Sequence, residues 1–512
     1  MSAASPSAWR PLKAVLGGLV DVPDRLEVSD ITQDSRTVIP GSAFCACRGR
    51  THHGLEFVEA AVAAGARAVL WEPAPGVRAP TLDSSILVRP VANLAAQLGY
   101  IADRFFGAPS ASMAIAGITG TNGKTTCAWL LAEALNQLGR RAAYIGTIGV
   151  GVPGALRASQ LTTPDALTLQ RELAGLRSAG VTAVAMEISS VALDQDRIAG
   201  LRVHTAVFTN LTRDHIDYHG DMTAYATAKA KLFAWPTLVA RIVNVDDAFG
   251  LELARERLQS ATDADAGLIV TSRRAADWAD RGVDFVATRN VISSASGLEL
   301  DVESSRGAAL LRSRLIGDFN VDNLLTVLAV LLAWNVPMPD ATAALERCSA
   351  PPGRMQPDGG EQLPLVLVDY AHTPDALAKA LRAAREHCAG KLWCVFGCGG
   401  DRDPGKRPEM GRIAGQLADQ LIVTDDNPRH EDPRSIVAAI MQGVIAAGAV
   451  DRTRVEHDRG AAIRGAVSAV AAGDVVLVAG KGHETYQQSG SERRPFSDAS
   501  VVHRVLLERS AP

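Results

Sequence analysis

Short apolar runs alternate with Ala- and Leu-rich segments of helical period along most of the chain. Within the runs polar and apolar positions hardly alternate, which is typical of parallel strands covered by helices on both faces. Each run is bounded at its end by Gly, Asp, Glu, Asn or Thr, and ligands of such sheets gather at the carboxyl ends of the strands. The pattern therefore predicts α/β sheets with polar sites along one edge. The runs are 181–186, 203–208, 365–368, 392–396, 420–424 and 475–479.

Two composition breaks predict domain boundaries. Phe106-Gly-Ala-Pro-Ser110 precedes a new apolar strand, and Cys348-Ser-Ala-Pro-Pro-Gly-Arg354 separates a helical segment from a new series of strands. A chain of 512 residues has room for about three domains of roughly 150 residues. We therefore expect domains at 1–107, 108–349 and 350–512.

The composition is that of an ordinary globular protein. The chain is 47% hydrophobic, and its 52 Lys and Arg against 56 Asp and Glu give a net charge of −4. This balance excludes disordered, collagen-like and disulfide-stapled classes and argues against nucleic acid as the main partner. The seven Cys include no C-x-x-C pair and are expected to be reduced thiols, most of them in the core.

Neither a targeting segment nor a membrane span is predicted. The first 20 residues lack the long apolar stretch of a signal peptide. The most apolar segment, 324–334, is much shorter than the roughly 20 residues that cross a bilayer and is expected to be a buried core helix. We expect a cytoplasmic protein.

A glycine-rich loop is the clearest motif. The apolar strand 113–116 runs into Gly117-Ile-Thr-Gly-Thr-Asn-Gly-Lys-Thr-Thr126, and the helix 127–138 follows. Backbone N–H groups of such a loop and the helix N-terminus bind phosphate, Lys124 would pair with the β- and γ-phosphates, and Thr125 would bind Mg²⁺. The strict P-loop pattern fails at Ile118, and the alternative is a tight turn with a solvent-facing lysine. We expect a P-loop-type nucleotide site formed by Gly117, Thr119, Gly120, Thr121, Asn122, Gly123, Lys124, Thr125 and Thr126; the family resemblance given below implies that the nucleotide is ATP and that this is an ATPase domain.

Further polar residues follow the strands of this central part. Glu187 ends one strand and is expected to be a second Mg²⁺ contact, the alternative being a helix-capping acid. Arg213, Asp214, His215, Asp217 and His219 are crowded together after the next strand, either as a functional cluster or as a solvated loop.

In this order the motifs resemble the Mur ligases of peptidoglycan synthesis. The resemblance extends from Asp34-Ser-Arg36 to Gly480-Lys-Gly-His-Glu484, with Gly-Thr-x-Gly-Lys-Thr between them. It implies three domains: a smaller N-terminal α/β domain that binds UDP, the central ATP-binding domain and a Rossmann-like C-terminal domain that binds an amino acid. It also implies that ATP phosphorylates a peptide carboxylate and that an amine displaces phosphate from the acyl phosphate. Mg²⁺, expected at two sites, and Lys124 would hold the negative charge that accumulates.

The resemblance assigns roles to particular residues. Thr125 and Glu187 would hold one Mg²⁺, and His215 would serve a second. Lys229 matches a lysine that the family carries as a carbamate, the alternative being a lysine on the helix surface. The catalytic residues implied are Lys124, Glu187, His215 and Lys229, and the implied metal ligands are Thr125, Glu187, His215 and carbamylated Lys229.

Four later residues match positions at the nucleotide. Asn320 and Asn323 match contacts to the adenine end of ATP, Arg354 matches an arginine at the γ-phosphate, and Asp369 matches a position beside the nucleotide. From composition alone the two asparagines could be helix caps and Asp369 a loop cap.

The UDP-linked peptide would be bound by residues of the first two domains. Thr163-Pro164 could equally be a plain helix start, with Thr163 as the cap. Val191 departs from the family, which often has His after the serine pair. The implied contacts are Ser35, Arg50, Thr51, His52, Thr162, Thr163, Ser189, Gln195 and Arg197.

The tetrapeptide Asp426-Asn427-Pro428-Arg429 is expected to determine which amino acid is added. In the resembling family it marks enzymes that add meso-diaminopimelate, whose second carboxylate a guanidinium can bind bidentately. Arg402 would be a further carboxylate partner, and Glu484 with Gly480 would receive the distal ammonium. The alternatives are that Asn-Pro-Arg is only a turn, or that the same chemistry is applied to L-lysine.

The expected substrates are UDP-N-acetylmuramoyl-L-alanyl-D-glutamate and meso-diaminopimelate, and a monomer is expected. Folylpolyglutamate synthetase shares the loop chemistry but lacks the Asp-Asn-Pro-Arg and Asp-Ser-Arg motifs. A P-loop switch protein is the alternative from another class.

Overall fold

The computed structural model describes residues 9–49, 52–260, 267–274, 277–278, 282–294, 296–360 and 363–510. The chain divides into two compact units. The first contains residues 1–124, 139–243 and 247–268, and the second contains 125–138, 244–246 and 269–512.

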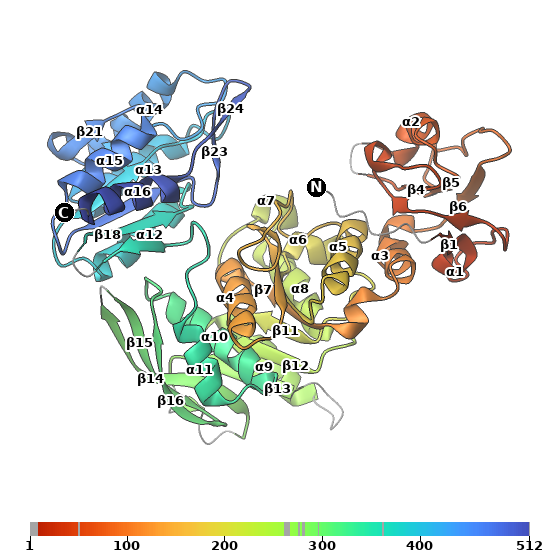
Figure 1. The fold of residues 1–512 in the computed structure, drawn as a ribbon, viewed down its shortest axis with the longest axis horizontal. Helices are drawn as coiled ribbons and strands as arrows, with labels where there is room; N and C mark the ends of the chain where they lie inside the picture. Colours follow the sequence, from red (N-terminus) through yellow and green to blue (C-terminus); the bar gives the residue numbers. More distant parts are fainter. Residues whose placement is uncertain are drawn as a thin grey trace. The chain divides into compact units, whose positions relative to one another are not determined.

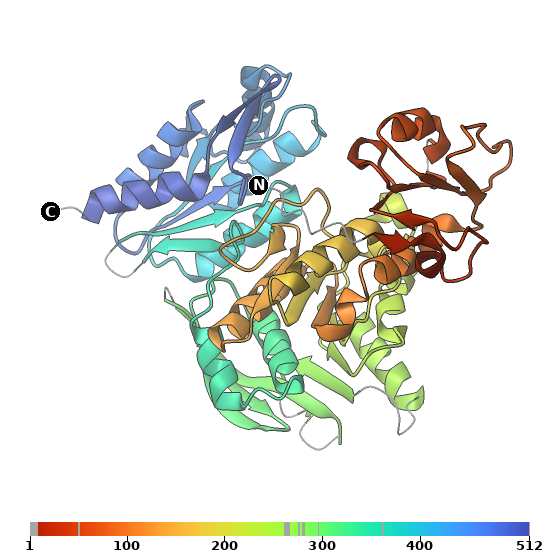
Figure 2. The same ribbon diagram turned by 45° about the vertical axis from the view of Figure 1, so that its right-hand side comes forward.

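The N-terminal part of the first unit is a small parallel sheet, drawn in red in Figures 1 and 2. Its four strands lie in the order β3-β4-β5-β6, and successive residues face opposite sides. Phe44 and Val69 pack toward α2, whereas Cys45 and Leu70 pack toward α1 and α3. The elements are β3 (Ile31–Thr32), β4 (Ala43–Ala46), β5 (Ala68–Trp71), β6 (Leu87–Pro90), α1 (Leu12–Leu16), α2 (Val58–Ala63) and α3 (Leu94–Phe105), with a small antiparallel pair β1 (Arg10–Pro11) and β2 (Glu27–Val28).

The central sheet of the first unit has the strand order β12-β11-β7-β10-β8-β9. Its first five strands are parallel, and β9 is antiparallel to β8. The parallel strands are buried along nearly their whole length, which explains why they read as continuous apolar runs. The elements are β7 (Ala114–Thr119), β8 (Ala142–Gly146), β9 (Gly149–Gly151), β10 (Ala183–Glu187), β11 (Thr205–Phe208), β12 (Ala240–Asn244), α5 (Ala166–Ser178), α6 (Ser190–Asp194), α7 (Ile216–His219), α8 (Met222–Ala230) and α9 (Ala248–Ser260).

The second unit contains strands in the order β16-β15-β14-β13, of which β14, β15 and β16 form an antiparallel meander. The predicted core helix is α10, and ten of the residues from Val321 to Leu332 are buried and are apolar or Thr. The elements are α4 (Lys124–Gln137), β13 (Gly267–Ser272), β14 (Asp284–Ser294), β15 (Gly297–Ser304), β16 (Gly307–Ser313), α10 (Asn320–Ala333) and α11 (Met338–Glu346).

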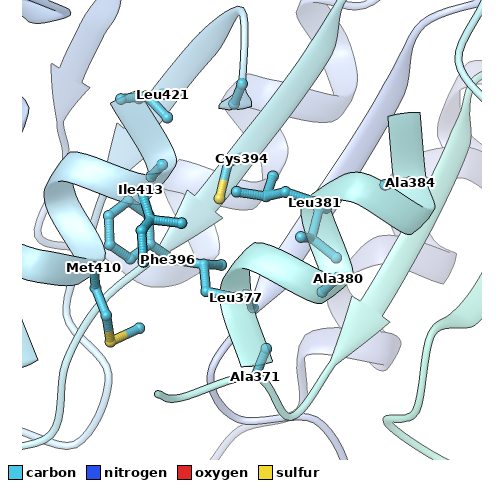
Figure 3. Close-up of a cluster of buried hydrophobic side chains, with 14 of the residues drawn as sticks. Ala371, Leu377, Ala380, Leu381, Ala384, Cys394, Phe396, Met410, Ile413 and Leu421 are labelled. Carbon is cyan, nitrogen blue, oxygen red and sulfur yellow. The ribbon is translucent and has the colours of Figure 1, made fainter. Parts of the chain in front are cut away.

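The C-terminal part of the second unit is a sheet of order β17-β18-β22-β19-β20-β21 with helices on both faces, in cyan and blue in Figure 1. Leu377, Cys394, Phe396 and Met410 belong to the core on one face, toward α12, α13 and α14 (Figure 3). The residues that point to the other face pack against α15 and α16; they are Val366, Val368, Val395, Ile422, Val476 and Val478. The elements are β17 (Gln356–Gly359), β18 (Leu365–Asp369), β19 (Leu392–Phe396), β20 (Gln420–Val423), β21 (Thr453–Val455), β22 (Val475–Ala479), α12 (Pro374–Glu386), α13 (Lys406–Leu417), α14 (Pro433–Ala446), α15 (Arg459–Ala469), α16 (Asp498–Ser510) and the hairpin β23 (Tyr486–Ser489) with β24 (Glu492–Pro495).

The predicted α/β class, with parallel strands at the apolar runs, is confirmed. All seven cysteines are free, and five of them are buried, as expected. Within the described part of the chain no helix has both the length and the apolar character needed to cross a membrane. The meander β14–β16 and the hairpin β23–β24 were not predicted.

Candidate functional site

The glycine-rich loop joins the end of β7 to the start of α4. Gly120 and Gly123 have φ angles of 147° and 86°, and a Cβ on Gly120 would collide with Thr209 Oγ1. Lys124 does not face solvent, because its Nζ donates to the carbonyls of Gly120 and Thr121 at 2.9 and 3.0 Å. The half-buried lysine is therefore folded back onto its own loop, which argues against the alternative of a solvent-facing lysine. The next two residues, Thr125 and Thr126, are buried in the first turn of α4.

A second segment, directly after β11, holds this loop in place. Thr121 N donates to Asn210 O at 2.8 Å, and Asn122 N donates to Asn210 Oδ1 at 3.0 Å. Thr209 Oγ1 donates to Asn122 O at 2.6 Å. Sequence analysis missed Thr209 and Asn210, although both stand at the carboxyl end of a predicted strand.

Lys229 is a buried amine beside the loop. Its side chain, near the end of α8, is 1% exposed, so the helix-surface alternative is wrong. Nζ donates to Gly120 O at 2.8 Å and lies 4.3 Å from the centre of the Tyr225 ring. Burial, and then the charge of Lys124, lower the pKa of Lys229 to about 6. The amine is therefore largely neutral at pH 7 and above.

Glu187 is a buried carboxylate at the carboxyl end of β10. Its Oε1 accepts hydrogen bonds from the Tyr144 hydroxyl and, at 2.9 Å, from Thr147 N. Its Oε2 accepts from Thr147 Oγ1 at 3.2 Å. Glu187 caps no helix, because the N-cap of the following α6 is Ser189. Sequence analysis missed Tyr144 and Thr147, which no local motif marks.

The polar cluster after β11 contains two histidines in different surroundings: one is hydrogen-bonded, and the side chain of the other is half exposed. His219 Nε2 lies 2.9 Å from Ser190 Oγ, whereas the side chain of His215 is 51% exposed and has Asp214 Oδ2 3.6 Å from its Nε2. His215 has a φ of 52°, a left-handed conformation that costs energy outside glycine. Among the described residues no group of three or more His, Cys, Asp or Glu side chains could hold a metal ion. A cation here would therefore need other oxygen donors, such as Thr hydroxyls, phosphates or a carbamate.

The residues expected to bind the peptide gather around the end of β10. Thr163 Oγ1 donates to Glu187 O at 2.9 Å and accepts from Ser189 N at 3.0 Å. Arg197 donates to Thr163 O at 3.1 Å and to Gln195 Oε1 at 2.6 Å. Thr163 is not a helix cap, since α5 begins after Asp165, whose carboxylate accepts from the first turn. The neighbouring Thr162 has its hydroxyl 3.1 Å from that of Thr147.

The residues expected to bind UDP are less fully described. Ser35 begins a short 3₁₀ helix whose N-cap is Asp34, and Asp34 also pairs with Arg36 at 2.7 Å. His52 Nδ1 lies 2.9 Å from Glu56 Oε2 on the surface. Arg50 and Thr51 lie outside the described residues.

The two asparagines expected at the adenine stand at the start of α10 and are buried. Asn320 Nδ2 donates to Ile316 O, and Asn323 Nδ2 donates to Asn320 Oδ1, both at 2.8 Å. The N-cap residue is Phe319, so the alternative that the asparagines cap this helix is wrong.

Asp369 is the last residue of β18 in the C-terminal sheet, and the charge of Arg354 acts on it. Asp369 accepts from Met355 N and Ala371 N at 2.7 and 2.8 Å, which also makes it the loop cap that the alternative proposed. Burial raises the pKa of Asp369, and the Arg354 charge opposes this shift. The Arg354 guanidinium lies 5.2 Å from the Tyr370 ring centre, and its buried Nε has no hydrogen-bond partner in the described part of the chain.

The segment after β20 contains Asp426 to Arg429. Arg429 has a φ of 52°, and its guanidinium donates to Gly400 O at 2.7 Å. A Cβ on Gly399 would lie 2.8 Å from Arg429 Nη1 and 3.8 Å from Arg402 Cγ, so both predicted carboxylate partners flank this glycine. The backbone of Arg429 is hydrogen-bonded to the hairpin β23–β24 through Gln488 O and Gly490 N. These contacts make the segment more than an isolated turn.

The segment after β22 meets the segment after β20. Asn427 Nδ2 donates to Glu484 Oε2 at 2.8 Å. Gly480 has a φ of 120°, and its N donates to Asp369 O at 3.0 Å. Lys481, to which sequence analysis gave no role although it lies inside a quoted motif, is fully buried between Asn427 and Glu484. Cationic and anionic groups therefore stand at one edge of the C-terminal sheet.

Comparison with known proteins identifies the family. Residues 27–105 match the Mur ligase family catalytic domain, 118–331 the Mur ligase middle domain and 353–482 the Mur ligase glutamate ligase domain. The chain is 47% identical over 487 residues to the UDP-N-acetylmuramoyl-L-alanyl-D-glutamate–2,6-diaminopimelate ligase of Pseudomonas aeruginosa, covering 95% of this chain and 96% of that protein. The chain belongs to the Mur ligase family. The protein of the same name from Chromobacterium violaceum is 46% identical, with 94% of each chain covered.

A solved structure of a Mur ligase agrees with this assignment. A UDP-N-acetylmuramoyl-L-alanyl-D-glutamate–2,6-diaminopimelate ligase has 33% sequence identity and a TM-score of 0.71, with 99% of this chain and 100% of that chain covered. A Mycobacterium tuberculosis folylpolyglutamate synthase has 18% identity and a TM-score of 0.56 over 75% of this chain and 92% of that one. That likeness shows a shared fold alone. The alternative of a P-loop switch protein is wrong, since this chain is a Mur ligase.

Proposed function

We propose that this Mur ligase joins meso-diaminopimelate to the terminal carboxylate of UDP-N-acetylmuramoyl-L-alanyl-D-glutamate, with ATP converted to ADP and phosphate. The contact between Asn427 and Glu484 carries the proposal, because it joins the segment with Arg429 to the segment with the anionic Glu484. A diamino diacid needs both charges at its far end: a cation for the carboxylate and an anion for the ammonium. Residues 350–512 would bind this amino acid, 1–107 the UDP moiety and 108–349 ATP.

The first half-reaction is phosphoryl transfer from ATP to the peptide carboxylate. The loop amides and Lys124 bind the phosphates, and Arg354 adds a second positive charge at the γ-phosphate. Asn320 and Asn323 would bind the adenine end of ATP, and Asp369 would lie beside the nucleotide. A carboxylate is a poor electrophile, and phosphorylation gives it a leaving group.

The second half-reaction is attack by the amine on the acyl phosphate. The amine nitrogen forms the new C–N bond, the tetrahedral intermediate expels phosphate, and the nitrogen loses its proton. Thr162, Thr163, Ser189, Gln195 and Arg197 would hold the peptide end, and Ser35 with the segment 50–52 would hold the UDP end.

Mg²⁺ fits the oxygen donors that the chain provides. Thr125 and Glu187 would bind one ion, with His215 and a carbamate on Lys229 serving a second. When bound, Mg²⁺ supplies positive charge for the transferring phosphoryl group. Lys229 suits carbamate formation, because its neutral amine can attack CO₂ to give an N-carboxylate and a proton, and the product presents anionic oxygens where an ammonium would repel the metal.

Product analysis tests the proposal. The purified protein is incubated with ATP, Mg²⁺, the UDP-linked dipeptide and either meso-diaminopimelate or L-lysine, and the product is weighed by mass spectrometry. We expect a product heavier by one diaminopimelate residue, equimolar phosphate release and little product with lysine. Preferential incorporation of lysine would overturn the proposed specificity.

A further inference from the structure

Lys481 is a fully buried cation in the C-terminal domain. It follows β22 and Gly480, and its side chain is 0% exposed. Its Nζ donates to Glu484 Oε2 at 2.9 Å and to Asn427 Oδ1 at 3.0 Å, and lies 3.6 Å from Asp426 Oδ1. Burying an ammonium is costly unless it is paired and hydrogen-bonded, and these contacts pair it. The residue cannot touch a substrate directly, because no part of its side chain reaches solvent.

The two oxygens of Glu484 have different surroundings. Oε2 accepts from both Lys481 and Asn427, at 2.9 and 2.8 Å. In the described part of the chain Oε1 takes no hydrogen bond, and the side chain is 19% exposed. One oxygen is thus fixed by two donors, and the carboxylate is oriented so that the other oxygen is available.

Lys481 also sets the orientation of Asn427. The amide oxygen of Asn427 accepts from Lys481 Nζ and, at 2.9 Å, from Gln488 N of the hairpin. This arrangement turns the amide NH₂ group toward Glu484, where it donates. A buried cation therefore fixes both ends of the Asn427–Glu484 contact.

The surrounding charges hold this arrangement together. Asp426 is buried beside Lys481, and burial raises the pKa of Asp426 while Arg459 and Lys481 oppose the shift. Behind it, Arg459 forms a fully buried pair with Asp498 through two hydrogen bonds of 2.7 Å, and donates to Ala479 O at 3.0 Å directly before Gly480. The segment from Ala479 to Glu484 is thus fixed at both ends.

We propose that Lys481 is a specificity-determining positioning residue: it fixes Glu484 so that Oε1 receives the distal ammonium of the diamino acid. The inference rests on the proposed function, and goes beyond it by assigning selectivity for the distal amine to a residue that does not contact the substrate. Lys481 acts through Glu484 and has no part in activation of the peptide carboxylate.

The test compares two amino acids and two steps. Lys481→Met removes the charge and keeps much of the volume. Diaminopimelate is compared with 2-aminopimelate, which keeps both carboxylates and the attacking amine but lacks the distal ammonium. Trapping of the acyl phosphate with hydroxylamine measures the first step without any amino acid, and also reports whether the variant is folded.

We expect Lys481→Met to raise the KM for diaminopimelate about 10-fold or more, in the range of a lost hydrogen bond to a charged group. The KM for 2-aminopimelate should change less than about threefold, and hydroxamate formation should be retained. Introducing Lys481→Met into Glu484→Gln should add little to the KM, because the two residues act as one unit. Lys481→Gln, which keeps an N–H donor for Glu484, should give an intermediate rise and serves as the second variant if the methionine form fails to trap the acyl phosphate.

Equal rises in KM for both amino acids, or additive effects of the two substitutions, would overturn the inference. If the wild-type protein does not use diaminopimelate at all, the proposed function fails. If it does, and Lys481→Met and Lys481→Gln leave its KM unchanged, only the role of Lys481 fails.

Discussion

Lys229 Nζ lies 2.8 Å from the carbonyl oxygen of Gly120, a residue of the phosphate loop. The lysine therefore reaches the loop that is expected to bind ATP, from a helix more than 100 residues further along the chain. Its burial lowers the pKa to about 6, so that the reactive, neutral amine predominates at physiological pH.

Loss of the Lys229 amine should abolish most activity. We expect Lys229→Met to lower kcat about 100-fold or more, since the carbamate oxygens cannot form. Short carboxylic acids added to the assay should restore part of the rate by supplying oxygens in their place. Lys231→Met is the matched control, because Lys231 lies two residues away with a side chain that is 46% exposed. An active Lys229→Met enzyme would contradict the assigned role.

The same burial should make stability depend on pH. The pKa of Lys229 is lower in the folded state than its usual value of 10.5, so the unfolded state binds more protons between about pH 6 and pH 10. The Lys229 contribution to the free energy of unfolding therefore rises with pH across this range. In CO₂-depleted buffer we expect Lys229→Met to be more stable than wild type at pH 7, by about 2 kcal/mol or more. The difference in urea unfolding should narrow by pH 10, and a constant difference would contradict this account.

Tyr144 should act through Glu187. Its hydroxyl donates to Glu187 Oε1, so Tyr144→Phe leaves the carboxylate in place but less well oriented. We expect about 10-fold more Mg²⁺ to be needed for half-maximal activity, with kcat at saturating Mg²⁺ largely retained. Tyr100→Phe, at an exposed tyrosine, is the control. A fall in kcat with no change in the Mg²⁺ requirement would show that Tyr144 has another role.

Arg429 should distinguish diaminopimelate from lysine. Arg429→Ala removes the guanidinium beside Gly399 and should lower kcat/KM for diaminopimelate about 100-fold, while the weak activity with lysine stays the same. Phosphate release with each amino acid measures this, with Arg434→Ala at an exposed position of α14 as the control. Unchanged turnover of diaminopimelate would exclude Arg429 as the carboxylate partner.

The buried pair Arg459–Asp498 should support the stability of the C-terminal domain. Asp498→Asn leaves the fully buried guanidinium without its anion, and we expect a loss of about 3–5 kcal/mol in the free energy of unfolding. Replacing both residues with leucine should cost less than Asp498→Asn alone. If the double leucine variant lost as much free energy of unfolding as Arg459→Leu and Asp498→Leu lose together when measured singly, an uncompensated buried charge would not be the cause.

Strands could be predicted from the sequence where the burial of a whole segment makes every one of its residues apolar. The runs at 365–368, 392–396 and 475–479 are strands because both sheet faces are covered, so each residue is apolar. The meander β14–β16 was missed because polar and apolar residues alternate in its central strand. In β15 the buried residues Leu298, Leu300 and Val302 are separated by acidic residues, so the strand contains no continuous apolar run.

The site residues that could be predicted from the sequence are those that lie next to one another in a contiguous motif. The phosphate loop and the Asp426–Arg429 segment are such motifs. The contact of Tyr144 with Glu187, 43 residues away, depends on β8 lying beside β10, which no local pattern encodes. Thr163 shows the same limit: next to a proline it looks like a helix cap, but its hydroxyl is bonded to the backbone at the end of β10.

Hydroxylamine trapping tests the central claim, that the protein makes the peptide carboxylate reactive by phosphorylating it. The nucleophile is supplied in place of diaminopimelate, together with ATP, Mg²⁺ and the UDP-linked dipeptide. We expect a hydroxamate of the dipeptide in amounts equal to the ADP released, and none when ATP is omitted. ADP release without any hydroxamate, from a protein that still forms the amide with diaminopimelate, would contradict the acyl-phosphate route.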